Sequence, residues 1–242
     1  MLLNTDPNVA DADGSTLLHW ICNRYCDNDL AKIFFKINND KNQWVHVDAE
    51  DNLGQTLLQL AVKNLLPCTV DALLNHGADL SSFVFPAVSH LGRRESECRT
   101  FLNAKLRLAA RALGIVQCFH NRGYELDQSG ALLIMKYFAE HELFAMSSDL
   151  EKRLCEDRYF ASRSKKILIK PDLSLFDLVQ LRPEKAQKLF IHPDYYNLTN
   201  SKKWSDLPEG LKKACEIHLS EKLSKELLKF VYIFHTHFIH NS

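Results

Sequence analysis

The chain has 242 residues, of which 46% are hydrophobic and 25% charged, as in an ordinary globular protein of one or two domains. Its 30 basic and 30 acidic residues cancel, so the sequence lacks the basic excess of most nucleic-acid-binding proteins. Eight glycines and seven prolines are too few for the many tight turns of an all-β protein, so we expect helices.

The first predicted element is a helical hairpin that opens with the hexapeptide Asp11 to Thr16, of the form Asp-x-x-Gly-x-Thr. An apolar segment follows and predicts a short inner helix. An outer helix is marked at i, i+3 and i+4 spacing by Leu30, Ile33, Phe34 and Ile37. We expect Asp27 or Asn28 to be its N-cap.

The second element, residues 51–80, repeats this pattern. It begins with the same Asp-x-x-Gly-x-Thr opening, breaks at Pro67, and ends at Gly77. A glycine just past the last periodic residue is typical of a chain that leaves a helix with positive φ. Two copies of one helix–turn–helix signature predict a repeat architecture.

The two copies resemble ankyrin repeats. Residues 16–19 (TLLH) and 56–59 (TLLQ) are similar to the Thr-Pro-Leu-His start of such a repeat, and residues 76–79 (HGAD) to its hairpin turn. Leucine replaces the usual proline in both copies, and Gln59 replaces the histidine of the second. The glycines Gly14 and Gly54 lie 40 positions apart, where ankyrin repeats have a period of about 33. We assign the excess to an enlarged hairpin over residues 38–48.

Because one repeat cannot bury its apolar face alone, we expect degenerate neighbours. Residues 116–126 echo residues 73–80, with Gly123 in the place of Gly77, so residues 83–126 are interpreted as a third repeat. The ankyrin region would then span residues 11–126. A fourth unit or helical cap is expected over residues 127–164, with Ser147 or Ser148 starting its second helix.

The pattern changes from Lys165 onward. After a basic lead-in (Lys165, Lys166, Lys170), the sequence predicts an amphipathic helix near residues 175–179 and a helix that starts at Pro183. A polar, aromatic connection follows over residues 192–204. Residues 206–209 then open a long helix to about Phe230, with Asp206 as N-cap and Pro208 in its first turn.

This C-terminal part, residues 165–242, resembles the PRANC domain, the C-terminal partner of ankyrin repeats in poxvirus proteins and insect relatives. The matching residues are 173–190, Trp204, 207–209 and 214–222. The resemblance implies a compact, F-box-like helical domain that docks on the linker subunit of cullin-type ubiquitin ligases. The docking residues it implies are Leu207, Pro208, Leu211, Cys215 and Leu219. The further helix and second Leu-Pro segment of relatives are missing, so the docking surface is expected to be incomplete.

Several clusters allow a chemical and a structural interpretation. His19 with Cys22 and Cys26 could bind a metal, or His19 could bond to neighbouring backbone while the thiols pack as small apolar groups. Cys215 and His218 could form a thiolate–imidazole pair, or Cys215 could pack on an apolar stripe. We favour the structural interpretation of both.

Two further clusters allow a chemical and a structural interpretation, and we again favour the structural one. The terminal histidines could bind a transition metal or belong to a frayed end: His235, His237 and His240. The basic lead-in could bind an acidic partner or form a solvated linker. No phosphate loop, paired-carboxylate motif or His-Glu-x-x-His is present, so we expect no enzyme, cofactor or metal site.

The seven cysteines include no Cys-x-x-Cys pair, as is typical of free thiols in a reducing compartment. Neither a signal peptide nor an apolar stretch of about 20 residues is found, so we expect cytoplasmic or nuclear residence and no membrane partner.

We therefore expect an all-α protein whose ankyrin repeats bind a target protein through their concave face. Six residues would line that face, together with those around residues 51–53: Ser15, His19, Asn23, Gln55, Gln59 and Lys63. One hypothesis makes the chain a substrate adaptor for a ubiquitin ligase. The alternative is a simple binding module or inhibitor that masks a signalling protein.

Overall fold

The computed structural model describes residues 6–24, 27, 29–92, 104–143 and 150–240. With 62% helix and 4% strand, it confirms the expected all-α fold. The chain forms two compact units. The first takes the described residues up to Gly92 together with Gln117–Tyr124, and the second takes the remaining described residues. The expected boundaries at residues 126 and 164 stay predictions.

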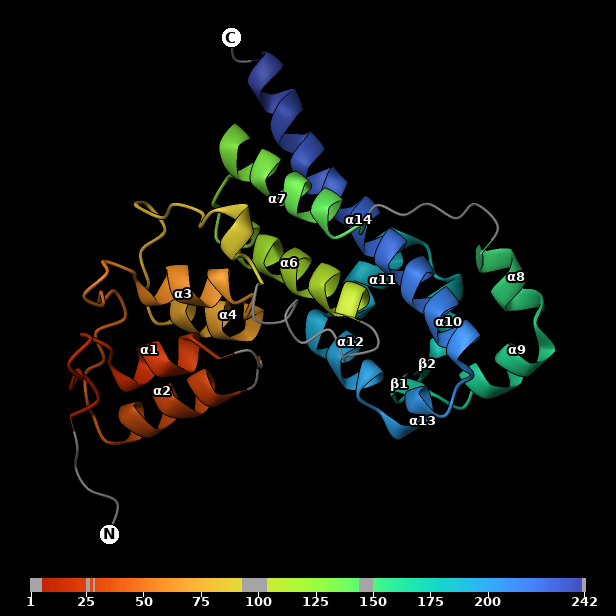
Figure 1. Cartoon of the computed structure of the whole chain (residues 1–242), viewed down its shortest axis with the longest axis horizontal. Coiled ribbons are helices and arrows are strands. Elements are labelled where there is room, and N and C mark those ends of the chain that lie inside the picture. Colours follow the sequence, from red (N-terminus) through yellow and green to blue (C-terminus); the bar gives the residue numbers. More distant parts are fainter. Residues whose placement is uncertain (1–5, 25–26, 28, 93–103, 144–149, 241–242) are drawn as a thin grey trace. The chain divides into compact units, whose positions relative to one another are not determined.

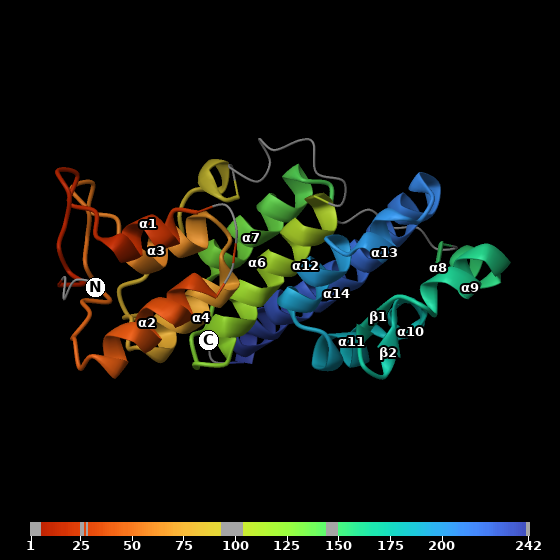
Figure 2. The same cartoon turned by 90° about the horizontal axis from the view of Figure 1, so that it is seen from below.

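Four short helices build the first unit: α1 (Leu17–Cys22), α2 (Leu30–Asp40), α3 (Leu57–Lys63) and α4 (Pro67–Asn75). The inner helices α1 and α3 lie side by side, as do the outer helices α2 and α4 (Figures 1 and 2). A 3₁₀ turn, η1 (Val88–His90), follows. The two expected helical hairpins are therefore stacked in parallel, as repeat one and repeat two.

Each repeat opens with a tight hairpin, which we name a finger: finger one is residues 10–16 and finger two is residues 50–56. Asp11 Oδ1 accepts the N–H groups of Asp13 and Ser15, both at 2.9 Å, and Asp51 Oδ1 makes the equivalent bonds in finger two. Asn52 joins the fingers, because its N–H and Nδ2 donate to main-chain oxygens of finger one. The Asp-x-x-Gly-x-Thr signature thus folds through local hydrogen bonds.

The helices end in a shared closure, in which a residue with positive φ follows the last turn. After α4, Ala78 N–H donates to Leu73 O and Gly77 has φ 91°. After α6 (Ala104–His120), Tyr124 N–H donates to Phe119 O and Gly123 has φ 72°. Both glycine positions confirm the sequence prediction, whereas the assignment of residues 83–126 to a third repeat stays a prediction. Closures without glycine, after α2, α3 and α7, were not predicted: they use Asn42, Leu65 and Glu142.

The expectation that Asp27 or Asn28 caps α2 is wrong for Asp27, and Asn28 lies outside the described residues. Asp29 precedes α2 and makes no side-chain cap. The Asp27 carboxylate instead accepts the N–H groups of Cys68 (2.7 Å) and Thr69 (3.2 Å). These N–H groups belong to the first turn of α4, whose own N-cap, Leu66, has no side chain that can accept. Repeat one therefore caps a helix of repeat two.

The predicted apolar stripe of α2 is also partly wrong. Phe34 is buried as expected, but Ile33 and Ile37 are 50% and 48% exposed. The buried side is completed by Phe35 and by Asn38, whose Nδ2 donates to Phe34 O. Asn38 is helical, so the enlarged hairpin starts after α2 rather than at residue 38.

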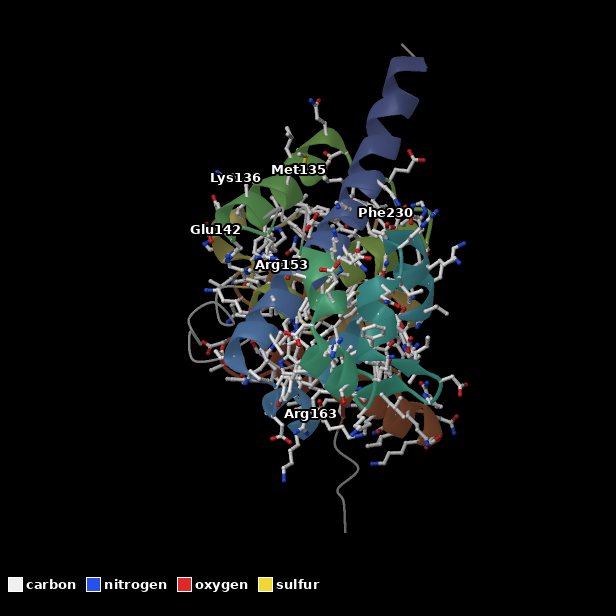
Figure 3. The ribbon with its side chains drawn as sticks, turned by 90° about the vertical axis from the view of Figure 1, so that its right-hand side faces the viewer. Met135, Lys136, Glu142, Arg153, Arg163 and Phe230 are labelled. Carbon is white, nitrogen blue, oxygen red and sulfur yellow. The ribbon has the colours of Figure 1, made fainter. Side chains whose placement is uncertain are left out.

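The second unit is built around α14 (Glu209–His240), which contacts α7 (Gln128–Glu140), α8 (Leu150–Glu156) and two further helices, α10 (Leu175–Gln180) and α11 (Pro183–Leu189). Pro183 begins α11, as predicted. A two-strand hairpin of β1 (Leu168–Lys170) and β2 (Leu173–Ser174) precedes α10. In Figure 3, Arg153 marks α8 and Arg163 marks α9 (Arg158–Ser164), while Met135 and Lys136 mark α7. Ser147 and Ser148 lie outside the described residues.

Three expectations for this unit need correction. The connection over residues 192–204 is helical, forming α12 (His192–Thr199) and α13 (Lys202–Ser205), because Pro193 lies in a first turn and Ser201 caps Trp204 N–H. The long helix ends at His240 rather than near Phe230. It begins one residue after Pro208, and Asp206 is the C-cap of α13. None of the helices in the described part of the chain is both long and apolar enough to span a membrane.

Candidate protein-binding groove

A groove of about 840 Å³ lies within the first unit, between the fingers and the inner helices. Five of the six residues expected on the concave face line it: Ser15, His19, Asn23, Gln55 and Lys63. The other lining residues are Asp13, Trp20, Asp51, Asn52, Leu53, Leu60, Asn64 and His90. The repeat pattern thus brings together side chains that are far apart in the sequence.

Gln59, the sixth expected residue, does not line the groove but has a capping role. Thr56 Oγ1 accepts Gln59 N–H, and Gln59 Oε1 accepts Thr56 N–H at 3.2 Å. The same reciprocal capping box joins Thr16 to His19, whose Nδ1 accepts Thr16 N–H at 3.0 Å. The departure from histidine at Gln59 is therefore conservative, because an amide oxygen replaces the ring nitrogen as acceptor.

His19 forms part of the groove floor and is only 1% exposed. Since Nδ1 accepts the Thr16 N–H, the neutral ring carries its proton on Nε2. This N–H is buried and interacts with the Ala49 carbonyl. Burial lowers the pKa of His19, while nearby Asp51, the Ala49 carbonyl and Asp11 partly oppose the shift.

The structural interpretation of His19 accords with these contacts. Cys26, one of the three suggested metal ligands, lies outside the described residues. Cys22 is fully buried, and burial raises its pKa. In the described ranges, no group of three or more His, Cys, Asp or Glu side chains is placed to hold a metal ion.

The groove also presents two large apolar side chains, of which sequence reasoning placed Leu53 on this face and missed Trp20. Trp20 is 58% exposed and Leu53, at the tip of finger two, is 83% exposed. Trp20 Nε1 donates to Asp11 Oδ2 at 3.0 Å, which fixes the indole on the carboxylate that also shapes finger one. Because Trp20 looks in the sequence like one more apolar residue of the inner helix, its pattern gave no signal of exposure.

The base of the groove is fixed by Asn64, which is buried. Its Nδ2 donates to Cys22 O at 3.1 Å and to Leu60 O at 3.0 Å. Lys63 O accepts Gly92 N–H at 2.8 Å, which attaches the segment after η1 to the end of α3. The polar lining is therefore carried by a hydrogen-bonded frame rather than by mobile loops.

The five residues expected to dock a ligase differ in how far they are buried. Leu207, Cys215 and Leu219 are buried, with exposures of 4%, 0% and 1%. Leu211 is half-buried and Pro208 is exposed. Three of the five side chains therefore pack in the core of the second unit.

Cys215 and His218 do not form a nucleophilic pair. Burial raises the pKa of Cys215 to about 12, so the thiol stays protonated. His218 Nε2 instead pairs with Val179 O at 3.0 Å, and Lys222 Nζ donates to Leu178 O, Val179 O and Leu181 O. Two basic side chains of α14 thus satisfy main-chain oxygens at the end of α10.

The remaining clusters have mixed outcomes. Lys170 Nζ lies 3.1 Å from Asp194, and Lys165 lies over the Phe176 ring at 4.8 Å. Lys166 is exposed. These contacts leave both interpretations of the basic lead-in as predictions. The side chains of His235, His237 and His240 lie outside the described part of the chain.

Comparison with known families gives one match. A family model described as ankyrin repeats (3 copies) matches residues 1–83 of the 242. This confirms the ankyrin repeats expected in the N-terminal part, and such repeats are protein-interaction modules. No curated protein and no solved structure matches the chain. The comparisons give no support for a PRANC or F-box-like domain in the C-terminal part.

Proposed function

We propose that this chain is a non-enzymatic binding protein whose ankyrin repeats hold a segment of a target protein in the groove. The observation that carries the proposal is the composition of the lining. Polar side chains that form no hydrogen bond or ion pair with a described residue (Ser15, Gln55, Lys63) lie beside exposed Trp20 and Leu53 on a hydrogen-bonded frame. Exchangeable polar groups around an aromatic anchor are typical of protein interfaces.

The state of the thiols supports a non-catalytic role. Burial raises the pKa of Cys118, like that of Cys215, to about 12, and it also raises the pKa of Cys22 and Cys68. A nucleophilic cysteine needs a lowered pKa, so none of these four is activated.

A matched pair of charge reversals tests the proposal. Proteins captured from cells by the full chain would be quantified for Lys63→Glu in the groove and for Lys41→Glu on the exposed end of α2. We expect Lys63→Glu to reduce capture of the target by about tenfold or more, because a reversed charge at an interface creates repulsion. Lys41→Glu should retain the target. Equal capture by both variants would contradict the proposal.

Recruitment of a cullin-type ubiquitin ligase is a separate hypothesis that rests on the PRANC resemblance. A docking surface needs accessible apolar side chains, but Leu207, Cys215 and Leu219 are buried. This burial supports the simpler alternative, a module or inhibitor that masks its target and recruits no ligase.

Direct binding separates the two hypotheses. The full chain would be mixed with purified cullin linker subunit and analysed by co-purification, and we expect no complex. The double variant Pro208→Ala with Leu211→Ala is the control, since it changes only the two accessible positions. A complex that this variant loses, without a drop in melting temperature, would favour the adaptor hypothesis.

A further inference from the structure

We propose that the finger side of the groove recognises a cationic side chain, arginine or lysine, which lies on the Trp20 indole between Asp13 and Asp51. The inference rests on the proposed function and names the chemistry that the groove selects in its target. It depends on two features: an oriented aromatic face and two available carboxylates of the fingers.

The aromatic face is prepared before binding. Asp11 bridges finger one and Trp20, because Oδ1 accepts the finger N–H groups while Oδ2 accepts the indole N–H. Five arginine or lysine side chains lie over aromatic rings in the described residues, and none of them lies over Trp20. Tryptophan is the aromatic side chain that attracts cations most strongly, so an exposed and fixed indole suits a guanidinium or ammonium group.

The two carboxylates supply the negative charge. Asp13 is exposed, and its carboxylate makes no hydrogen bond or ion pair with a described residue. Asp51 uses Oδ1 for the Leu53 and Gln55 N–H groups, which leaves Oδ2 for a ligand. Lys63, the basic residue of the lining, belongs to the last turn of α3 rather than to a finger. The groove therefore has an acidic finger side, which selects for a cation.

The three tryptophans provide the assay. Trp20 lies in the groove, Trp44 is 73% exposed outside it, and Trp204 is buried at 1%. Their indole N–H signals in a ¹H–¹⁵N spectrum of the full chain can be assigned by single substitution to phenylalanine. The probe is the peptide acetyl-Gly-Ser-Arg-Ser-Gly-amide, and its control contains citrulline, the neutral isostere of arginine.

We expect the arginine peptide to shift the Trp20 signal saturably, with an apparent Kd of about 1–10 mM, since one cation–π contact and two exposed ion pairs supply little free energy. The citrulline peptide should bind at least about fivefold more weakly. The Trp44 and Trp204 signals should stay in place. The double variant Asp13→Asn with Asp51→Asn should lose the preference for arginine, although the amide oxygen introduced at position 51 would still accept the finger N–H groups.

Equal shifts with both peptides, or no Trp20 shift with either, would overturn the inference, as would a Trp44 shift as large as that of Trp20. Lys63→Glu separates this result from the proposed function. If that variant loses the cellular target while the arginine peptide fails to bind the parent, the groove binds proteins through other chemistry. If the peptide binds but capture does not depend on Lys63, the cation site stands and the proposed function fails.

Discussion

Repeat one and repeat two have the same backbone fold, yet equivalent side chains are exposed in one repeat and buried in the other. Leu17 is 58% exposed, whereas its counterpart Leu57 is fully buried. In the outer helices Ile37 is 48% exposed and its counterpart Ala72 is 2% exposed, when the helices are aligned by their closures at Asn38 and Leu73. Repeat one covers this face of repeat two, while the described residues leave the same face of repeat one open. Burial in the stack is therefore decided by the neighbour and not by the pattern of the helix.

The largest expected effect comes from placing the same charge at Ala72 and Ile37. Ala72→Lys inserts an ammonium into the contact between α2 and α4 and should cost roughly 3 kcal/mol or more of unfolding free energy. Ile37→Lys should change it by less than about 0.5 kcal/mol, as for most surface substitutions. Urea unfolding of both variants measures the difference. Similar losses would mean that the exposed face of α2 is covered in solution.

The next effect concerns the cap that repeat one supplies to repeat two. Asp27→Ala removes the acceptor of the Cys68 and Thr69 N–H groups and should cost about 2 kcal/mol, at the upper end for a helix N-cap. Asp29→Ala is the matched control, because Asp29 precedes α2 without a side-chain cap. It should be nearly neutral. Equal melting temperatures for the two variants would show that the cap between repeats contributes nothing.

A third comparison uses the finger glycines, Gly14 and Gly54, which have φ of 75° and 70°. Alanine at either position forces a side chain to positive φ and should cost about 1 kcal/mol. At Gly14 the new Cβ would also lie 2.5 Å from Asn52 Oδ1, whereas at Gly54 nothing lies within 4 Å. Thermal unfolding should therefore show a larger loss for Gly14→Ala. An equal loss would mean that finger two separates readily from finger one.

The smallest expected effect is a loss of stability at acid pH that is due to His19. Its counterpart in repeat two, Gln59, does not titrate. Because burial holds the pKa of His19 below 6.5, the unfolded chain takes up a proton first as the pH falls. Stability due to this group is present above the unfolded pKa and declines as the pH falls below it. His19→Gln keeps the acceptor of the capping box, as Gln59 does. Between about pH 7 and about pH 5 the parent should lose more stability than this variant. Parallel losses would contradict the assignment.

Local features of the fold could be predicted from the sequence. The fingers, the closures at Gly77 and Gly123, and the start of α11 at Pro183 depend on bonds over a few residues. Features that depend on contacts between distant residues could not be predicted from it. The partner of Asp27 is 41 positions away, and positive φ at Leu65 is held by surrounding packing although leucine disfavours it.

The residues of the candidate site could likewise be predicted only in part. Ser15 and Gln55 occupy equivalent positions in the two repeats, and so do Asn23 and Lys63. The repeat pattern therefore predicted all four on one face, and all four line the groove. Trp20 was missed because the equivalent residue of repeat two, Leu60, is buried, so the pattern favoured burial for both. For the residues implied by the PRANC resemblance, burial depends on the packing of α14, which its apolar positions do not specify by themselves.

The position of Asp27 has a consequence for how the repeats unfold. The first turn of α4 lacks a cap of its own and obtains one only when repeat one is folded against it. Loss of structure in repeat one therefore exposes unpaired N–H groups in repeat two, and fraying spreads across the boundary. We expect the two repeats to melt in a single cooperative transition rather than one after the other. This coupling keeps both walls of the groove in register until the whole stack is lost.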